Sequence, residues 1–232
     1  MTTVTILSGG AAQGLVRGLI EAFKAQTGLG IDGEFGAVGI MADKLRAGTS
    51  ADLVILTQAL LAKLATEKLV DPSSIADVGR VETALAVRSR DPRVTVKTEA
   101  DLRDVLRSAD AIYVPDTKAS TAGQHVAKVL DQLGIAYEAA SRLKIFPNGA
   151  TAMRELAAST AQRPIGCTQA TEIIATDGIA LSGALPPGCE LVTMYTTGVT
   201  ARAAHPNEAA ALVALLTGTD RKELRQRVGF AG

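Results

Sequence analysis

Short apolar runs typical of β-strands alternate with longer runs of helical periodicity almost from the first residue. Residues 3–7 form the first apolar run, and residues 11–26 after it place Leu15, Leu19 and Phe23 on one helical face. Alternation of this kind favours βαβ units with parallel strands, in which helices cover the sheet. We therefore predict an α/β fold.

The same interpretation extends along the chain. The predicted strands are residues 3–7, 31–35, 52–56, 81–89, 111–114, 143–146, 164–168 and 190–201. The predicted helices are residues 11–26, 40–47, 58–67, 99–108, 121–133, 136–142, 151–159, 170–176, 207–216 and 220–227. The extended runs 81–89 and 190–201 interrupt the alternation, so we interpret them as strands that cross between two lobes. Lobe 1 is expected to contain residues 1–83 and 195–232, and lobe 2 residues 84–194.

The composition argues against several classes of partner. Of the 232 residues, 47% are apolar and 21% are charged, with 24 basic residues against 24 acidic ones. Binding to nucleic acid or to an anionic membrane needs a basic excess, which this chain lacks. Four Phe, three Tyr and no Trp leave little material for stacking on bases or sugars. We expect a monomeric globular protein with a small-molecule ligand and no nucleic acid partner.

Metals and nucleotide cofactors are not indicated either. Cys167 and Cys189 do not combine with His125 and His205 into the spacing of a zinc site. We interpret the cysteines as two isolated thiols, with a single disulfide as the alternative. The Gly9–Gly10 turn is not a dinucleotide fingerprint, and the chain has no phosphate-binding Gly-Lys-Ser/Thr loop. We expect no cofactor and no metal.

The chain carries no targeting or spanning segment as written. No stretch approaches the roughly 18 apolar residues needed to cross a membrane. The start lacks the charged and apolar regions of a secretory signal. The expected location is therefore periplasmic if a signal was removed and a methionine replaced it, and cytoplasmic otherwise.

Several predicted turns between a strand and a helix carry small hydroxyl residues or glycines. They are Ser8–Gly9–Gly10, Val38–Gly39, Ser120–Thr121–Ala122–Gly123, Asn148–Gly149–Ala150–Thr151 and Thr168–Gln169. Helix N-termini present unpaired N–H groups and a partial positive charge, so such turns bind anions without a cationic side chain. In open α/β sheets they gather at the carboxyl ends of the strands. The alternative for any one of them is an ordinary helix cap, because Ser, Thr and Asn are the preferred capping residues.

The turns define the predicted ligand-binding residues. These are Ser8, Gly9, Gly10, Val38, Gly39, Ser120, Thr121, Asn148, Thr151 and Thr168. Two further side chains are candidate acids or bases if the chain is an enzyme. Glu172 follows Thr168 by one helical turn, and His125 follows Thr121 by four residues. A solvated carboxylate and an exposed or capping histidine are the alternatives for these two.

Segments spread over the whole chain resemble the molybdate-binding branch of the type II periplasmic solute-binding proteins. The segments are residues 4–11 (VTILSGGA), 19–23 (LIEAF), 34–39 (EFGAVG), 51–56 (ADLVIL), 166–169 (GCTQ), 207–216 and 228–230 (VGF). The resemblance implies a two-lobed type II fold with mixed sheets and two crossing strands as a hinge. It also implies that a small anion is captured between the lobes for uptake by an ABC-type permease.

Two positions depart from the oxyanion-binding pattern of that branch. Val38 stands where the pattern places a serine, and Thr168 stands where it usually places a tyrosine. A missing donor would leave a tetrahedral oxyanion under-coordinated, at about 1.5–3 kcal/mol for each lost charged hydrogen bond. A small carboxylate with an apolar middle would suit Val38 better than molybdate.

The chain is also similar to the trans-aconitate isomerases of the same superfamily, at Ser120–Thr121–Ala122–Gly123 and in lacking the molybdate turn. That similarity implies an alternative function, the isomerisation of an unsaturated tricarboxylate in the same site. Glu172 or His125 would then move the proton.

Overall fold

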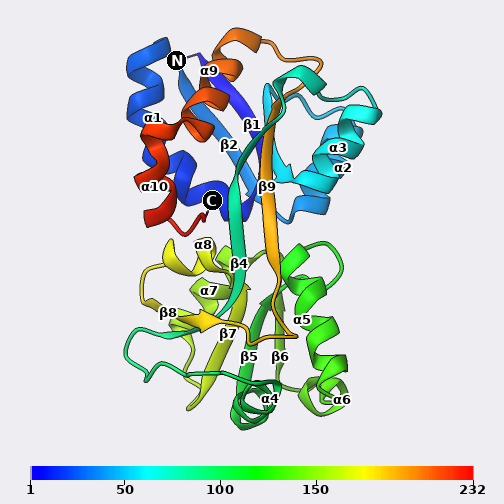
Figure 1. The fold of residues 1–232 in the computed structure, drawn as a ribbon, viewed down its shortest axis with the longest axis vertical. Helices are drawn as coiled ribbons and strands as arrows, with labels where there is room; N and C mark the ends of the chain where they lie inside the picture. The colour runs from blue at the N-terminus through cyan, green and yellow to red at the C-terminus, as the bar shows by residue number, and fades with distance from the viewer. Residues whose placement is uncertain (1, 232) are drawn as a thin grey trace. The chain divides into compact units, whose positions relative to one another are not determined.

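The chain divides into two units, each built on strands that are covered by helices (Figure 1). The computed structural model describes residues 2–231. Unit 1 contains the residues up to Val81 and those from Met194 onward, and unit 2 contains Glu82–Thr193. Strands β4 (Ala76–Arg88) and β9 (Val192–Val199) have residues in both units.

In unit 1 the strand order is β2-β1-β3-β9. Strand β1 pairs in parallel with β2 and β3, and β3 pairs with β9 in the antiparallel direction. Helices α1, α9 and α10 pack together on one side in Figure 1, and α2 and α3 pack together on the other. The elements besides β4 and β9 are β1 (Thr3–Gly9), η1 (Gly10–Ala12), α1 (Gln13–Thr27), β2 (Gly30–Gly36), α2 (Val38–Arg46), β3 (Leu53–Thr57), α3 (Gln58–Thr66), η2 (Pro72–Ser74), α9 (Pro206–Thr217), η3 (Thr219–Arg221) and α10 (Lys222–Arg227).

Helix α1 shows how the apolar pattern becomes structure. Leu15, Leu19 and Phe23 recur at helical spacing and are fully buried. The helix ends at Gly28, whose φ of 76° lies in the left-handed region that glycine adopts without strain. The Gly28 N–H closes the last turn on the Lys24 carbonyl, so the chain can turn into β2.

In unit 2 the strand order is β4-β7-β5-β6, and β8 pairs with β4. Strand β5 pairs in parallel with β6 and β7, whereas β4 is antiparallel to β7 and β8. The elements besides β4 and β9 are α4 (Glu99–Ser108), β5 (Ala111–Pro115), α5 (Thr121–Gln132), α6 (Ala136–Ala139), β6 (Leu143–Phe146), α7 (Gly149–Ala158), β7 (Pro164–Gln169), α8 (Ala170–Ile174) and β8 (Ile179–Ala184).

The two faces of strand β7 pack against different helices. Ile165 and Cys167 belong to the apolar core that contains the buried residues of α4 and α5. Gly166 faces the other way, because a Cβ atom there would meet Met153 and Leu156 of α7. Side chains alternate along a strand, so Thr168 lies on the α7 face and Gln169 on the α5 face.

The predicted α/β fold is confirmed, with mixed sheets flanked by helices. Each predicted helix and strand is present with bounds that shift by a few residues. Strand β8 was not predicted, and β4 starts at Ala76 rather than at residue 81. Strand β8 is half-buried and contains a serine and a glycine, so it lacks a strong apolar pattern.

The cysteines and the helix lengths can be compared with what the sequence predicts. Cys167 and Cys189 are both buried and unpaired, as isolated thiols would be. Burial raises the pKa of the Cys167 thiol to about 12, so that thiol is inert at neutral pH. Across residues 2–231, no helix combines the length and the apolar character that spanning a membrane requires.

Candidate functional site

Two turns in unit 1 present helix N-termini that no side chain caps. Strands β1 and β2 end side by side, with Ser8 opposite Phe35 and Gly9 opposite Gly36. The chain continues from β1 into η1 and α1, and from β2 into α2, and none of these N-termini carries a side-chain cap. The first N–H groups of a helix have no partner within it. The two turns therefore offer adjacent backbone donors at one edge of the sheet.

Val38 belongs to the second of these turns, and its side chain packs against Gly9 of the first. A Cβ atom on Gly9 would stand 2.7 Å from Val38 Cγ1 and 3.1 Å from Tyr195 Cε1. A side chain at position 9 would force Val38 to shift, because the Val38 and Tyr195 side chains fill the space beside the Gly9 Cα. Val38 is 6% exposed and thus places a buried apolar side chain next to the first turn.

Ser8 is fully buried at the end of β1. Its hydroxyl donates to the Gly9 carbonyl at 2.9 Å, which keeps the hydroxyl within the first turn. Ser8, Gly9, Gly10, Val38 and Gly39, all predicted as binding residues, thus come from two neighbouring turns of unit 1.

The turn before α5 in unit 2 has only a long side-chain cap. Ser120 caps this helix only weakly, since its Oγ accepts from the Gly123 N–H at 3.5 Å. The preceding loop is held by Asp116, whose carboxylate accepts from the backbone N–H groups of Lys118 and Ala119. These two hydrogen bonds lower the pKa of Asp116. The N-terminus that contains Thr121 is held in place by the loop rather than by a strong cap.

The turn before α7 is already occupied by a carboxyl group of the chain. Asn148 Oδ1 accepts from the Thr151 N–H at 2.8 Å. The Glu172 carboxyl group accepts from the Thr168 hydroxyl at 2.6 Å and from backbone N–H groups of Gly149, Ala150 and Gln169. The N–H groups that an external anion would need at α7 are therefore bound to Glu172 and Asn148.

Glu172 is 7% exposed, far from the solvated carboxylate considered for it. Burial raises its pKa above the usual range of glutamate, while the Thr168 hydroxyl and the backbone N–H groups act in the opposite direction. Gly149 leaves room for this arrangement, because a Cβ atom there would stand 1.9 Å from Glu172 Oε2 and 2.2 Å from Thr168 Oγ1. Glu172 thus joins α8 and β7 to the start of α7.

His125 makes a contact within unit 2 as well. Its Nε2 atom lies 2.8 Å from the Cys189 carbonyl oxygen, and the side chain is partly buried. This bond joins α5 to the segment before β9. Both candidate acid or base groups therefore have partners in the structure.

Among residues 2–231, three buried side-chain oxygens near the end of β7 have no hydrogen-bond partner. They are Thr83 Oγ1, Gln169 Oε1 and Thr171 Oγ1, and Thr83 is paired with Gln169 in the β4–β7 ladder. Thr83 is 1% exposed and Gln169 is 3% exposed. An unpaired buried polar group costs about 1–3 kcal/mol, so native structures contain few of them.

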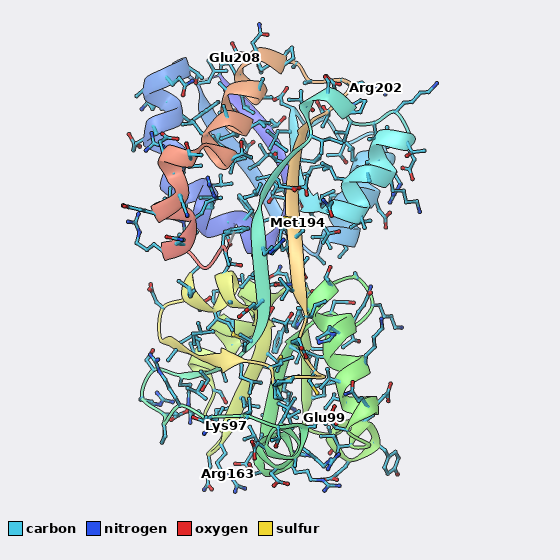
Figure 2. The ribbon with its side chains drawn as sticks, viewed as in Figure 1. Lys97, Glu99, Arg163, Met194, Arg202 and Glu208 are labelled. Carbon is cyan, nitrogen blue, oxygen red and sulfur yellow. The ribbon has the colours of Figure 1, made fainter. Side chains whose placement is uncertain are left out.

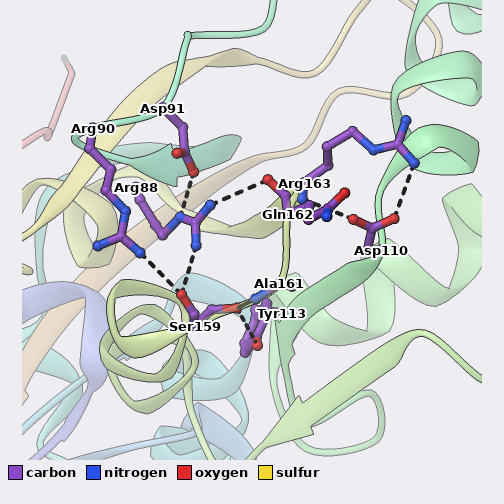
Figure 3. Close-up of polar contacts among 9 residues, drawn as sticks. All are labelled: Arg88, Arg90, Asp91, Asp110, Tyr113, Ser159, Ala161, Gln162 and Arg163. Carbon is purple, nitrogen blue, oxygen red and sulfur yellow. Dashed lines mark hydrogen bonds and ion pairs between the residues drawn. The ribbon is translucent and has the colours of Figure 1, made fainter.

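The buried Arg88 guanidinium of unit 2 has hydrogen-bond and ion-pair partners within the unit (Figure 3). Arg88 pairs with Asp91 at 2.5 Å and donates to the Ser159 carbonyl at 2.7 Å, and Arg90 donates to the same carbonyl at 3.2 Å. Ser159 is the C-terminal cap of α7, where carbonyls lack helical partners and cations are favourable. This cluster stabilises the end of α7.

Arg163 and Arg202 lie at the opposite ends of strands from the candidate turns. Arg163, labelled in Figure 2, directly precedes β7 and pairs with Asp110. In unit 1 Arg202 follows β9 and lies near the amino end of β3. Among residues 2–231, no three His, Cys, Asp or Glu side chains are grouped as a metal ion would require. Backbone N–H groups are therefore the main donors of the unit 1 turns.

Comparison with known proteins connects this geometry to a family. Residues 4–231 match the family described as bacterial extracellular solute-binding protein. The chain belongs to this family. It is also 27% identical over 231 residues to an aconitate isomerase from a Pseudomonas species, which covers 95% of this chain and 84% of that protein.

Solved structures of this solute-binding family's fold agree with the architecture. The periplasmic molybdate-binding protein of Azotobacter vinelandii has a TM-score of 0.81 and 16% identity, covering 99% of both chains. The sulfate-binding protein of Mycobacterium tuberculosis has a TM-score of 0.76 and 21% identity, covering 99% of this chain and 86% of that one. The type II periplasmic-binding-protein fold and the predicted family resemblance are thereby confirmed.

Some polar residues near the site were not predicted. Tyr195 beside Gly9, and Thr83, Gln169 and Thr193 in unit 2, lie on or next to the crossing strands. Gln169 was part of a recognised turn, but its side chain was not assigned a role. Only the pairing of β4 with β7 reveals that Gln169 and Thr83 lie opposite each other.

Proposed function

We propose that this solute-binding protein captures a small carboxylate anion. The observation that carries the proposal is the pair of uncapped turns at the ends of β1 and β2, with the Val38 side chain of the second turn packed against Gly9 of the first. Their backbone donors suit a carboxylate, and Val38 suits the apolar carbon next to it. That the ligand lies between the lobes stays a prediction.

The choice of a carboxylate over a tetrahedral oxyanion rests on Val38. An oxyanion such as molybdate needs donors around all of its oxygens, and a valine side chain offers none. A dicarboxylate or tricarboxylate has charged ends and an apolar middle. The side chain that weakens oxyanion binding therefore contributes to binding such an acid.

In unit 2 the α5 turn is the best candidate for a second set of donors. Ser120 and Thr121 lie there, and the Ser120 cap is long enough to be displaced. Asn148, Thr151 and Thr168 are weaker candidates, because the α7 turn is occupied by Glu172. The proposed ligand contacts are Ser8–Gly10 and Val38–Gly39 in unit 1 and Ser120–Thr121 in unit 2.

Membership of the family supports a role in uptake. A solute-binding protein of this kind delivers its anion to a membrane permease of the ABC type, and we propose the same for this chain. Delivery requires that binding be reversible, which suits backbone donors that hold the ligand without a covalent step.

A thermal-shift screen tests the carboxylate proposal. We expect a dicarboxylate or tricarboxylate to raise the melting temperature more than molybdate, tungstate or sulfate. Ligand at about 100 times its dissociation constant stabilises a protein by about 2.7 kcal/mol. For a chain of this size that is a shift of roughly 5–11 °C. A shift with oxyanions alone would contradict the carboxylate, and no shift with any anion would contradict anion binding.

The isomerase alternative is favoured by one observation, the similarity to an aconitate isomerase. Isomerisation of an unsaturated acid by proton transfer exchanges a substrate proton with a group on the protein and then with solvent. The same acids incubated with the protein in deuterated water distinguish the two functions. We expect no deuterium on carbon, which is the result for a protein that binds the acid without transferring a proton. Incorporation that depends on the protein would establish the isomerase instead.

A further inference from the structure

We propose that Gln169, with Thr83 and Thr193, binds a hydroxyl group of the ligand, so that the preferred carboxylate is a hydroxy acid. We call these three residues the Gln169 cluster. All three are at least nine-tenths buried in unit 2. The inference rests on the proposed function and names the ligand class more narrowly.

The Gln169 cluster has one internal hydrogen bond and two polar groups without a hydrogen-bond partner. Gln169 Nε2 donates to Thr193 Oγ1 at 3.3 Å, which fixes the direction of the amide. The amide oxygen of Gln169 and the hydroxyl of Thr83 are left without partners. Because directly paired residues project to the same face of a sheet, both unpaired groups lie on one face. The cluster therefore lacks one group that can both donate and accept.

The cluster lies on the α5 face of the sheet in unit 2. Leu85, two residues after Thr83, and Cys167, two residues before Gln169, both belong to the core around α5. Gln169 also lies at the end of β7 that is next to the loop before α5. Tyr113 is level with Gly166 in the β5–β7 ladder, so counting three residues on places Asp116 level with Gln169. Asp116 begins the loop that leads to Ser120 and α5.

The N–H donors of the α5 turn and the polar groups of the Gln169 cluster therefore lie at the same end of the α5 face of the sheet. The α5 turn supplies N–H donors for a carboxylate oxygen. The Gln169 cluster supplies an acceptor, the amide oxygen, and a hydroxyl that can donate or accept. A hydroxyl group on the ligand would donate to Gln169 and accept from Thr83. An ionised oxyanion or a plain carboxylate offers acceptors only and would leave Gln169 Oε1 unpaired.

Calorimetric titration with matched acids tests the inference. Malate and succinate differ by one hydroxyl group, as do citrate and tricarballylate. We expect the wild-type protein to bind the hydroxy acid of a pair at least tenfold more tightly than its partner. In Gln169→Leu the ratio should fall to about one, with the affinity for the plain acid changed less than threefold. The matched control is Gln162→Leu, at an exposed glutamine of the same unit, which should keep the wild-type ratio.

The outcomes separate this inference from the proposed function. Equal binding of the two acids of a pair would overturn the inference while leaving carboxylate binding intact, and would mean that water alone fills the cluster. No binding of any carboxylate would overturn both. If Gln169→Leu does not fold, Thr83→Val has nearly the same shape as wild type and removes the second unpaired group. An unchanged ratio in Thr83→Val would likewise contradict the inference.

Discussion

Replacing Gly123 with alanine is expected to lower the free energy of unfolding by about 3 kcal/mol or more, because the added methyl group meets fixed backbone. A Cβ atom at Gly123 would stand 2.1 Å from the Asp116 carbonyl oxygen and 2.5 Å from that of Pro115. Neither oxygen can rotate away as the end of a side chain could. Helix α5 would have to move off the end of β5, which would also displace the Ser120 turn. Urea denaturation followed by circular dichroism measures the change.

The control for this substitution is Gly18→Ala in helix α1. Its new Cβ atom would meet the flexible side chain of Leu224, with Cδ1 nearest at 3.0 Å. Alanine is also preferred over glycine inside a helix by about 1 kcal/mol. We therefore expect Gly18→Ala to be close to neutral or stabilising. Equal loss of stability in the two variants would contradict the packing described for α5.

Replacing Glu172 with alanine is expected to cost about 3–5 kcal/mol, since it strands several buried donors at once. The Thr168 hydroxyl and the N–H groups at the start of α7 would lose their acceptor in a closed interior. The matched control is Glu155→Ala, at an exposed glutamate of α7, where a change within about 0.5 kcal/mol is expected. A similar small loss in Glu172→Ala would contradict the role of Glu172 in joining α7 to β7.

Glu172 also makes stability depend on pH. Because burial raises its pKa in the folded chain, the folded state holds its proton more tightly than the unfolded state does. The contribution from the protonated group is complete below the ordinary glutamate pKa of about 4.3, and it is lost as pH rises through the raised value. The stability of wild type relative to Glu172→Gln should therefore fall as pH rises from about 4 toward neutrality. A rise over the same range would show that the hydrogen bonds outweigh burial.

Most of the fold could be predicted from the sequence because its signals are local. The apolar face of α1 and its glycine stop are examples, since each depends on residues within a few turns of one another. Strand β8 could not be predicted, because it is stabilised by pairing with β4, which lies about 90 residues earlier in the chain. Pairing between strands so far apart in the sequence does not require an apolar pattern within β8 itself.

The candidate site was predictable in its unit 1 turns and less so in unit 2. Small residues after a strand indicate a turn that can bind an anion, and Gly9 and Gly39 carried that signal. The same signal at Asn148 and Gly149 does not indicate a free turn, because the Glu172 carboxyl group already occupies the turn before α7. Which turns keep free donors depends on tertiary packing, which no local pattern reports.

The most direct test of the proposed binding turns is a titration of the ¹⁵N-labelled protein with malate, followed through backbone amide resonances. We predict that Gly10, Gly39 and Thr121, in the uncapped or weakly capped turns, show the largest saturable shifts. Gly149 and Ala150 should show small shifts, because their N–H groups are bound to Glu172. Large shifts at Gly149 and Ala150 with none at Gly10 and Gly39 would contradict this prediction.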